Sequence, residues 1–335
     1  MPEFNFKTTP YDHQREAFDA SCDTENYALL MDMGTGKTKV CIDTIGYNYE
    51  RGKINLAVIV APKGVIANWI GEISTHLPDR IDREVVLWKP SLTKAKRKEL
   101  TDLSQPAGKL KFLLMNRRAK RTQAVCDVGR GAVTKRILTG SPVTKSPMDL
   151  YSQMDFLSPE ILGFRSYYAF QGRYAVVQRR SMGAHSFNQI LGFRRLDELT
   201  EKLQNFSYRV RKEECLDLPE KVYVRRSVEL TKEQSDAYTQ MKHLALARLE
   251  SGELATTQNV LTQIMRLQQI CLGHLTDDEG ETHPVKSNRL GELLTIADEI
   301  QGKAIIWATW SRDIRAIAEA LRDRFSVQAV ATLHG

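Results

Sequence analysis

The sequence predicts an α/β protein whose first domain is a doubly wound parallel sheet, and three observations support this prediction. Short apolar segments rich in Val, Ile and Leu alternate with segments of helical periodicity, which is the pattern of strands joined by crossover helices. One of these apolar segments ends at a glycine-rich turn that leads into a helix. The chain has 335 residues, which is enough for two domains at roughly 100–200 residues each.

Five strands are expected in the first part of the chain. Each is a run of mostly apolar residues bounded by polar or turn-forming residues, and such runs are typical of parallel strands buried on both faces. One helix is expected directly after the first strand and another after the second. The expected strands are 27–31, 54–62, 84–88, 109–116 and 134–142.

The character of the sequence changes after residue 148. Helical periodicity extends to about residue 275 and predicts a mainly helical insertion with a connector. KAIIWATW (303–310) then predicts a strand, and a helix and a further strand over 327–335 follow it, so a second α/β unit begins here and is truncated. The predicted domains are 1–157, 158–285 and 286–335.

Composition excludes several classes of protein. Hydrophobic residues make up 42% and charged residues 27% of the chain, as in ordinary globular proteins. No run of about eighteen apolar residues is present, so no membrane span is expected, and the N-terminus lacks the apolar core of a signal peptide. Five scattered cysteines fit a reducing compartment, so we expect a cytoplasmic protein. The net charge of +7 fits a nucleic-acid partner without requiring one.

The stretch LLMDMGTGKTKV (29–40) has the pattern of a phosphate-binding loop. Gly34 and Gly36 allow backbone N–H groups to converge on phosphate oxygens, and the helix that follows adds its positive end. Lys37 can reach the β and γ phosphates, and Thr38 can hold Mg²⁺. The alternative is a glycine turn that contains an incidental lysine.

Two other segments have two interpretations each. In YDHQREAF (11–18), Gln14 can offer a donor and an acceptor to an adenine edge, or it is an ordinary surface glutamine. In LTGSP (138–142), Thr139 and Ser141 can bond an acidic group or a DNA phosphate, or they cap a turn before the next helix.

Read in order, these segments resemble the Swi/Snf-type helicase-like ATPases of superfamily two. YDHQREAF resembles their glutamine motif, and MDMGTGKT resembles their variant phosphate loop, in which the first glycine is commonly replaced, here by Met31. APKGVIANWIGEI (61–73) is similar to their motif Ia, and LTGSP resembles motif III. YRVRKEECLDLPEKVYVRRSVELTKEQSDAY (208–238) resembles the passage between their two lobes.

The resemblance implies two RecA-like lobes that close on ATP and Mg²⁺ and hold double-stranded DNA. Lys37 and Thr38 would be the catalytic residues, with Thr38 on Mg²⁺. The implied nucleotide-binding residues are Gln14, Met33, Gly34, Thr35, Gly36, Lys37 and Thr38. The implied DNA-binding residues are Lys63, Thr139 and Ser141. Arg209 and Arg211 form a basic cluster with Lys212 that either contacts DNA as well or is a solvated surface.

Two parts of the family pattern are missing from the sequence. The acidic motif II, a strand that ends in Asp-Glu, should lie between Asn116 and Thr134, where no apolar run exists. We hypothesise that Asn116 and Arg117 are not neighbours in the natural protein, because loss of that strand would leave a hole in the centre of the sheet. Motifs V and VI, with the arginine that reaches the γ-phosphate, are also missing, so this chain alone is expected to hydrolyse ATP poorly.

The expected function is that of a DNA-dependent ATPase that moves along double-stranded DNA. We expect a monomer of bacterial or phage origin, located in the cytoplasm of the bacterium or of the infected host cell. One alternative is a catalytically inactive DNA-binding module with the same fold. Another is a superfamily-two helicase that separates strands.

Overall fold

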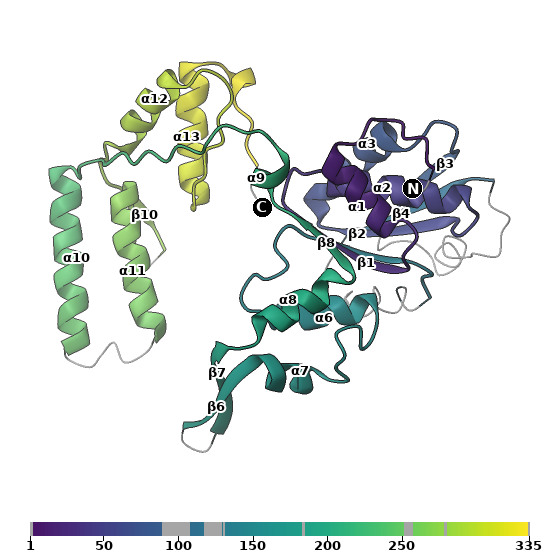
Figure 1. Ribbon diagram of the computed structural model, residues 1–335. Helices are drawn as coiled ribbons and strands as arrows, with labels where there is room; N and C mark the ends of the chain where they lie inside the picture. Colours follow the sequence, from purple (N-terminus) through teal and green to yellow (C-terminus); the bar gives the residue numbers. More distant parts are fainter. Residues whose placement is uncertain are drawn as a thin grey trace. The chain divides into compact units, whose positions relative to one another are not determined.

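The computed structural model divides the chain into two compact units, 1–220 and 221–335, and each is described by itself. Figure 1 shows the helices and strands along the chain. The described residues are 3–88, 108–116, 129, 131–182, 185–250, 257–277 and 280–333.

The first unit contains a three-stranded parallel sheet centred on β1 (Asn26–Met31). β5 (Lys135–Leu138) pairs with one edge of β1, and β8 (Ser207–Val210) pairs with the other. Alternate side chains of β1 enter two different apolar clusters, one that contains Leu29 and one that contains Leu30. β1 is therefore buried on both faces, as the sequence predicts for a parallel strand.

A second three-stranded parallel sheet lies in the same unit. β4 (Leu110–Asn116) is its central strand, between β2 (Leu56–Ala61) and β3 (Arg83–Leu87). These three strands and β1 and β5 confirm the five predicted strand segments. The sequence TKAKRKEL (93–100) also predicts a solvated basic helix, but this segment lies outside the described residues.

Three helices of the N-terminal part pack on these sheets: α1 (Asp12–Ser21), which precedes β1, α2 (Lys37–Glu50), which follows β1, and α3 (Ile66–His76), which follows β2. A short 3-10 helix, η1 (Lys63–Val65), precedes α3. The side chains of α2 enter one apolar cluster on each sheet. Tyr47 packs in the cluster of β1 that contains Leu29, whereas Ile42 packs in the cluster formed by β2 and β4. Because one helix covers both sheets, the two sheets belong to one folded unit (Figure 1).

Each sheet has an edge strand, β5 or β2, that pairs on one side only. β5 pairs only with β1, and β2 pairs only with β4, among the described residues. Leu138 of β5 contacts the clusters of both sheets, yet all four residues of β5 are only half-buried. A missing central strand would produce this arrangement. The Asn116–Arg117 junction, where we predict the missing segment, lies outside the described residues because Arg117 is not described.

Arg136 ties β5 to the end of α1. Its guanidinium donates four hydrogen bonds of 2.6–2.8 Å to backbone carbonyl oxygens, which belong to Ser21, Thr24, Glu25 and Lys135. A cation at the C-terminal end of a helix is also favoured by the helix dipole. Burial lowers the pKa of Arg136, but the four acceptors hold the charged form in place.

Replacing Arg136 by lysine is expected to destabilise the first unit by about 2 kcal/mol. An ammonium has three donors and no planar fork, so at least one of the four carbonyl oxygens loses its partner, and a lost hydrogen bond to a charged group costs about 1.5–3 kcal/mol. Urea unfolding of the two proteins measures the difference. Equal urea midpoints for the two proteins would show that water can replace the hydrogen bonds of the guanidinium without a loss of stability.

The rest of the first unit covers the other face of β1. Phe170, Tyr174 and Leu157 lie fully buried in the cluster that contains Leu30. The elements here include an antiparallel hairpin that the prediction of a mainly helical segment did not contain. They are α6 (Asp149–Leu157), α7 (Tyr167–Tyr174), β6 (Ala175–Met182), β7 (His185–Phe193), α8 (Leu196–Gln204) and α9 (Lys212–Cys215).

The second unit consists of helices and one small hairpin. Its elements are α10 (Lys232–Glu250), α11 (Thr257–Leu272), β9 (His274–Thr276), β10 (Thr282–Pro284), α12 (Arg289–Glu299), α13 (Ser311–Arg324) and the 3-10 helix η3 (Val327–Ala329). The segment predicted as one insertion, 158–285, is thus divided between the two units at residue 220. No helix in the described part of the chain has both the length and the apolar character to cross a bilayer.

Two predicted strands of the second unit are wrong. The segments 303–310 and 327–335 form no strand in the described residues, and 327–329 is a 3-10 turn. Ile305 and Trp307 are 83% and 88% exposed. A strand needs a neighbour to satisfy its backbone groups, and within the described residues neither segment has one. The parallel sheet expected in a second lobe is therefore not assembled from these segments.

Candidate nucleotide site

The phosphate loop joins β1 to α2 and contains two glycines in left-handed conformation. Gly34 has φ = 86° and Gly36 has φ = 88°, values that favour glycine. Gly36 is also the N-cap residue of α2. A Cβ atom on Gly36 would lie 2.3 Å from Nε2 of Gln14, so Gly36 is required both for the backbone turn and for the close approach of α1.

Lys37 lies on the loop, with its ammonium at the carboxyl end of β1. Its Nζ donates to the carbonyl oxygens of Met31 and Asp32 at 2.7 and 2.8 Å. Burial lowers the pKa of Lys37, whereas the nearby Asp32 carboxylate opposes this shift. Thr38 is the next residue of α2 and is half-buried. The predicted catalytic pair therefore lies at the N-terminus of a helix, where anionic groups are favoured.

Helix α1 holds the phosphate loop from one side. A ring nitrogen of His13 lies 2.8 Å from the carbonyl oxygen of Thr35, and Nε2 of Gln14 donates to the same oxygen at 3.2 Å. Oε1 of Gln14 accepts from the N–H of Tyr11 at 3.1 Å. A carboxamide has two donors and two acceptor sites, so Gln14 keeps one of each for a ligand. Sequence reasoning missed His13, although it stands beside Gln14 in the same motif.

The remaining loop residues of the predicted site differ in exposure. Met33 is 79% exposed and Thr35 is 1% exposed. The Thr35 hydroxyl donates to the carbonyl oxygen of Asp32 at 2.7 Å, so this side chain stabilises the loop itself. Met33 and Thr35 are thus placed to act through their backbone rather than their side chains.

The LTGSP turn at the end of β5 lies against the phosphate loop. A Cβ atom on Gly140 would lie 3.1 Å from the backbone nitrogen of Met33 and 3.2 Å from the carbonyl oxygen of Met31. The hydroxyl of Thr139 accepts from the N–H of Ser141 at 3.1 Å, which is the turn-capping role in the second interpretation. Ser141 is exposed. The turn is therefore in contact with the site where phosphate would bind.

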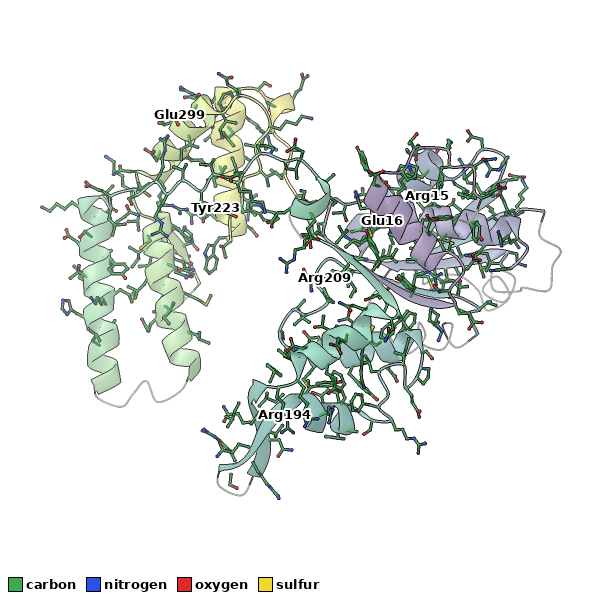
Figure 2. All side chains as sticks on the ribbon, in the orientation of Figure 1. Arg15, Glu16, Arg194, Arg209, Tyr223 and Glu299 are labelled. Atoms are coloured by element: carbon green, nitrogen blue, oxygen red, sulfur yellow. The ribbon has the colours of Figure 1, made fainter. Side chains whose placement is uncertain are left out.

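The chain after β8 also reaches the phosphate loop and divides the predicted basic cluster. The N–H of Lys212 donates to Oδ2 of Asp32 at 3.1 Å, and the Lys212 side chain lies beside Gly34. Arg209 and Arg211 are exposed, and Arg209 lies on β8 (Figure 2). Only Lys212 of these three is close to the loop.

Lys63 belongs to a different part of the first unit. It begins η1, directly after β2 of the second sheet, and is exposed. Trp69 on α3, six residues later, is buried among the side chains of β2 and β4, which fixes the start of that helix. The structure thus places Gln14, the phosphate loop and the LTGSP turn together, whereas Lys63 follows another strand.

The first unit supplies only part of a Mg²⁺ site. Mg²⁺ is usually held by one or two carboxylates together with substrate phosphates and water. Thr38 offers a hydroxyl, and the Asp32 carboxylate already accepts the Lys212 N–H. The part of a Mg²⁺ site that motif II would supply falls in the stretch between Asn116 and Thr134, most of which lies outside the described residues.

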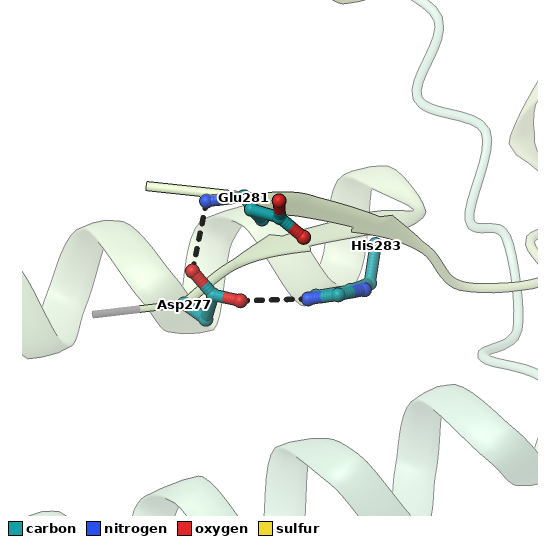
Figure 3. A group of neighbouring side chains, drawn as sticks. All are labelled: Asp277, Glu281 and His283. Carbon is teal, nitrogen blue, oxygen red and sulfur yellow. Dashed lines mark hydrogen bonds and ion pairs between the residues drawn. The ribbon is translucent and has the colours of Figure 1, made fainter. Parts of the chain in front are cut away.

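Across the described ranges, one group of three side chains has metal-ligating atoms within 4.8 Å of one another: Asp277, Glu281 and His283 in the second unit. Figure 3 shows that they lie on the β9–β10 hairpin. The Asp277 carboxylate accepts from the Glu281 N–H at 2.8 Å and lies 2.8 Å from Nε2 of His283. These contacts close the hairpin turn.

The parallel sheet, the glycine loop and the lysine at the start of α2 define a P-loop nucleotide-binding protein with a RecA-like fold. Residues 113–274 match the family model described as the SNF2-related domain. The resemblance to Swi/Snf-type helicase-like proteins is thereby confirmed.

Comparison with known proteins gives distant relatives of the same kind. The chain is 25% identical over 281 residues to the "Helicase-like transcription factor" of Mus musculus, covering 73% of this chain and 27% of that protein. It is 24% identical over 324 residues to the "Uncharacterized ATP-dependent helicase MG018" of Mycoplasma genitalium, covering 88% and 29%. This chain therefore spans less than a third of the length of these relatives.

Among solved structures, this chain is similar to the "Sulfolobus solfataricus SWI2/SNF2 ATPase core in complex with dsDNA". The TM-score is 0.48 and the sequence identity 20%, and the match covers 96% of this chain and 71% of that one.

Proposed function

We propose that the protein is a DNA-dependent ATPase that couples ATP hydrolysis to movement along double-stranded DNA. The observation that carries this proposal is the contact between the LTGSP turn and the phosphate loop, through Gly140 and the backbone of Met31 and Met33. A change at the nucleotide phosphates can thus reach Thr139 and Ser141, which the family pattern assigns to DNA. The names of the relatives, which include ATP-dependent helicases, support the same class of activity.

In this proposal the nucleotide lies at the N-terminus of α2. The backbone N–H groups from Gly34 to Thr38 surround the phosphates, Lys37 neutralises their charge, and Gln14 contacts the adenine. Thr38 holds Mg²⁺, which neutralises charge on the β and γ phosphate oxygens as the γ-phosphoryl group is transferred.

Lys63, Thr139, Ser141, Arg209 and Arg211 form the proposed DNA contacts. Lys63, Ser141, Arg209 and Arg211 are exposed, and the chain has a net charge of +7. Contacts between basic side chains and phosphates are independent of base sequence and weaken steeply with salt. The proposed protein acts as a cytoplasmic monomer.

The test is the rate of ATP hydrolysis with and without double-stranded DNA, at several salt concentrations, on protein whose intact mass has been measured. We expect stimulation by DNA that declines as salt rises. A measured mass above 38.1 kDa for the natural gene product would reveal additional residues, such as the segment predicted after Asn116. Hydrolysis that is indifferent to DNA would contradict the proposal.

A second candidate is a DNA-binding module without hydrolytic activity. It is favoured by the free edges of β5 and β2 among the described residues, since the strand expected between them would provide the acidic residues. Such a module would bind ATP and DNA but release no phosphate at the natural length.

A strand-separating helicase is distinguished by displacement of a labelled strand from a duplex, which a translocase does not produce.

A further inference from the structure

Lys212 is fixed beside the phosphate loop by two backbone contacts. β8 runs parallel to β1, with Val210 opposite Met31, and the carbonyl oxygen of Val210 accepts from the N–H of Asp32 at 3.1 Å. The Asp32 carboxylate in turn accepts from the N–H of Lys212 at 3.1 Å. The first residue of the loop thus binds a segment that lies 180 positions later in the sequence.

The side chain of Lys212 lies over the turn of the loop. Its Nζ and Cε are 3.7 and 3.8 Å from the position that a Cβ atom would take on Gly34. Gly34 is exposed and Lys212 is half-buried, so both remain accessible to a ligand. The ammonium therefore lies beside the turn of the phosphate loop at Gly34.

The ammonium of Lys212 differs from that of Lys37 in its partners. Lys37 donates to two backbone carbonyl oxygens, whereas the Lys212 ammonium has no hydrogen bond or ion pair within the described part of the chain. A protonated amine beside a phosphate loop, with its donors unused by protein, is suited to bind phosphate oxygens.

We propose that Lys212 is a second lysine of the nucleotide site and binds the polyphosphate of the nucleotide directly. This inference rests on the proposed nucleotide site and deepens it. It also separates Lys212 from Arg209 and Arg211, which remain candidate DNA contacts. Lys212 begins α9, nine residues before the second unit starts at Lys221. Nucleotide binding to Lys212 therefore acts on the segment that leads to that unit.

The test is the affinity of the full chain for the fluorescent analogue mant-ATP and for ATPγS, measured for the wild type, Lys212→Met, Lys212→Arg and Arg209→Met. One lost hydrogen bond to a charged group corresponds to a loss of about tenfold or more. We expect that loss for Lys212→Met, partial recovery for Lys212→Arg and no change for Arg209→Met. The Lys212→Met variant keeps the apolar stem of the side chain and the backbone hydrogen bond to Asp32. A loss of nucleotide affinity in this variant alone therefore reports on the missing ammonium.

Binding of a labelled DNA duplex to the same four proteins, without nucleotide, completes the experiment. Lys212→Met is expected to bind DNA like the wild type. If it binds nucleotide like the wild type, or loses DNA affinity instead, Lys212 is not a nucleotide ligand and the inference is overturned while the nucleotide site stands. If the wild type binds no nucleotide, the proposed function fails as well.

Discussion

Replacing Lys37 by alanine is expected to abolish DNA-stimulated ATP hydrolysis by the natural-length protein. The ammonium lies at the start of α2 and donates to the carbonyl oxygens of Met31, the last residue of β1, and of Asp32, which follows it. Lys37 is the residue of the loop whose side chain can reach the β and γ phosphates of a bound nucleotide. Its removal should also lower ATP affinity about tenfold to a hundredfold, the equivalent of one charged hydrogen bond.

Phosphate release and mant-ATP binding measure these effects, and Lys53→Ala is the control. Lys53 is an exposed lysine that pairs with Asp23 at 3.2 Å, away from the phosphate loop in sequence. We expect Lys53→Ala to leave ATP hydrolysis unchanged, and Lys37→Ala to leave DNA affinity unchanged. Hydrolysis that survived Lys37→Ala would show that the phosphate loop is assigned wrongly.

Replacing Asp43 by leucine is expected to cost about 3–5 kcal/mol of unfolding free energy. Asp43 forms an ion pair of 2.6 Å with Lys39 on the buried face of α2, with side chains only 2% and 6% exposed. Removing one partner leaves an uncompensated buried charge. The double variant Lys39→Met with Asp43→Leu should recover most of the loss, because no charge then remains to be desolvated. Urea unfolding of the three proteins gives the comparison.

The pair Arg15–Asp19 on α1 is the matched control. It has the same four-residue spacing and a distance of 3.1 Å, but its side chains are 35% and 25% exposed. Pairs of this kind contribute only about 0.3–0.5 kcal/mol, so Asp19→Asn should change stability little. A similar loss for Asp19→Asn and Asp43→Leu would contradict the role we give to burial.

The same pair predicts a pH dependence. Burial raises the pKa of Asp43 from 3.8 to about 6, against the attraction of Lys39, and Oδ1 of Asp43 has no hydrogen-bond partner in the described structure. The folded state therefore takes up a proton at higher pH than the unfolded state, and this contribution to stability is lost as the pH rises through about 6. The stability of the wild type relative to Asp43→Asn should be greater at pH 5 than at pH 7. A smaller difference at pH 5 would show that the pKa of Asp43 is lowered.

The five N-terminal strands and the phosphate loop could be predicted because their signals are local. Each strand is an uninterrupted apolar run, and the left-handed turns at Gly34 and Gly36 are encoded by the glycines themselves. The prediction failed for 303–310, which has an equally apolar sequence. A strand also requires a partner strand to pair with, and the apolar pattern of a segment does not show whether one is present.

The sequence by itself determined the class of this protein: a P-loop α/β fold with an SNF2-related pattern, in which Lys37 and Thr38 are the proposed nucleotide ligands. Only the tertiary structure decided which distant residues meet that loop. His13 reaches Thr35 through the packing of α1, and Lys212 reaches Gly34 through the register of β8 on β1. Such contacts depend on the pairing of segments far apart in the chain, and spacing along a sequence carries no information about that pairing.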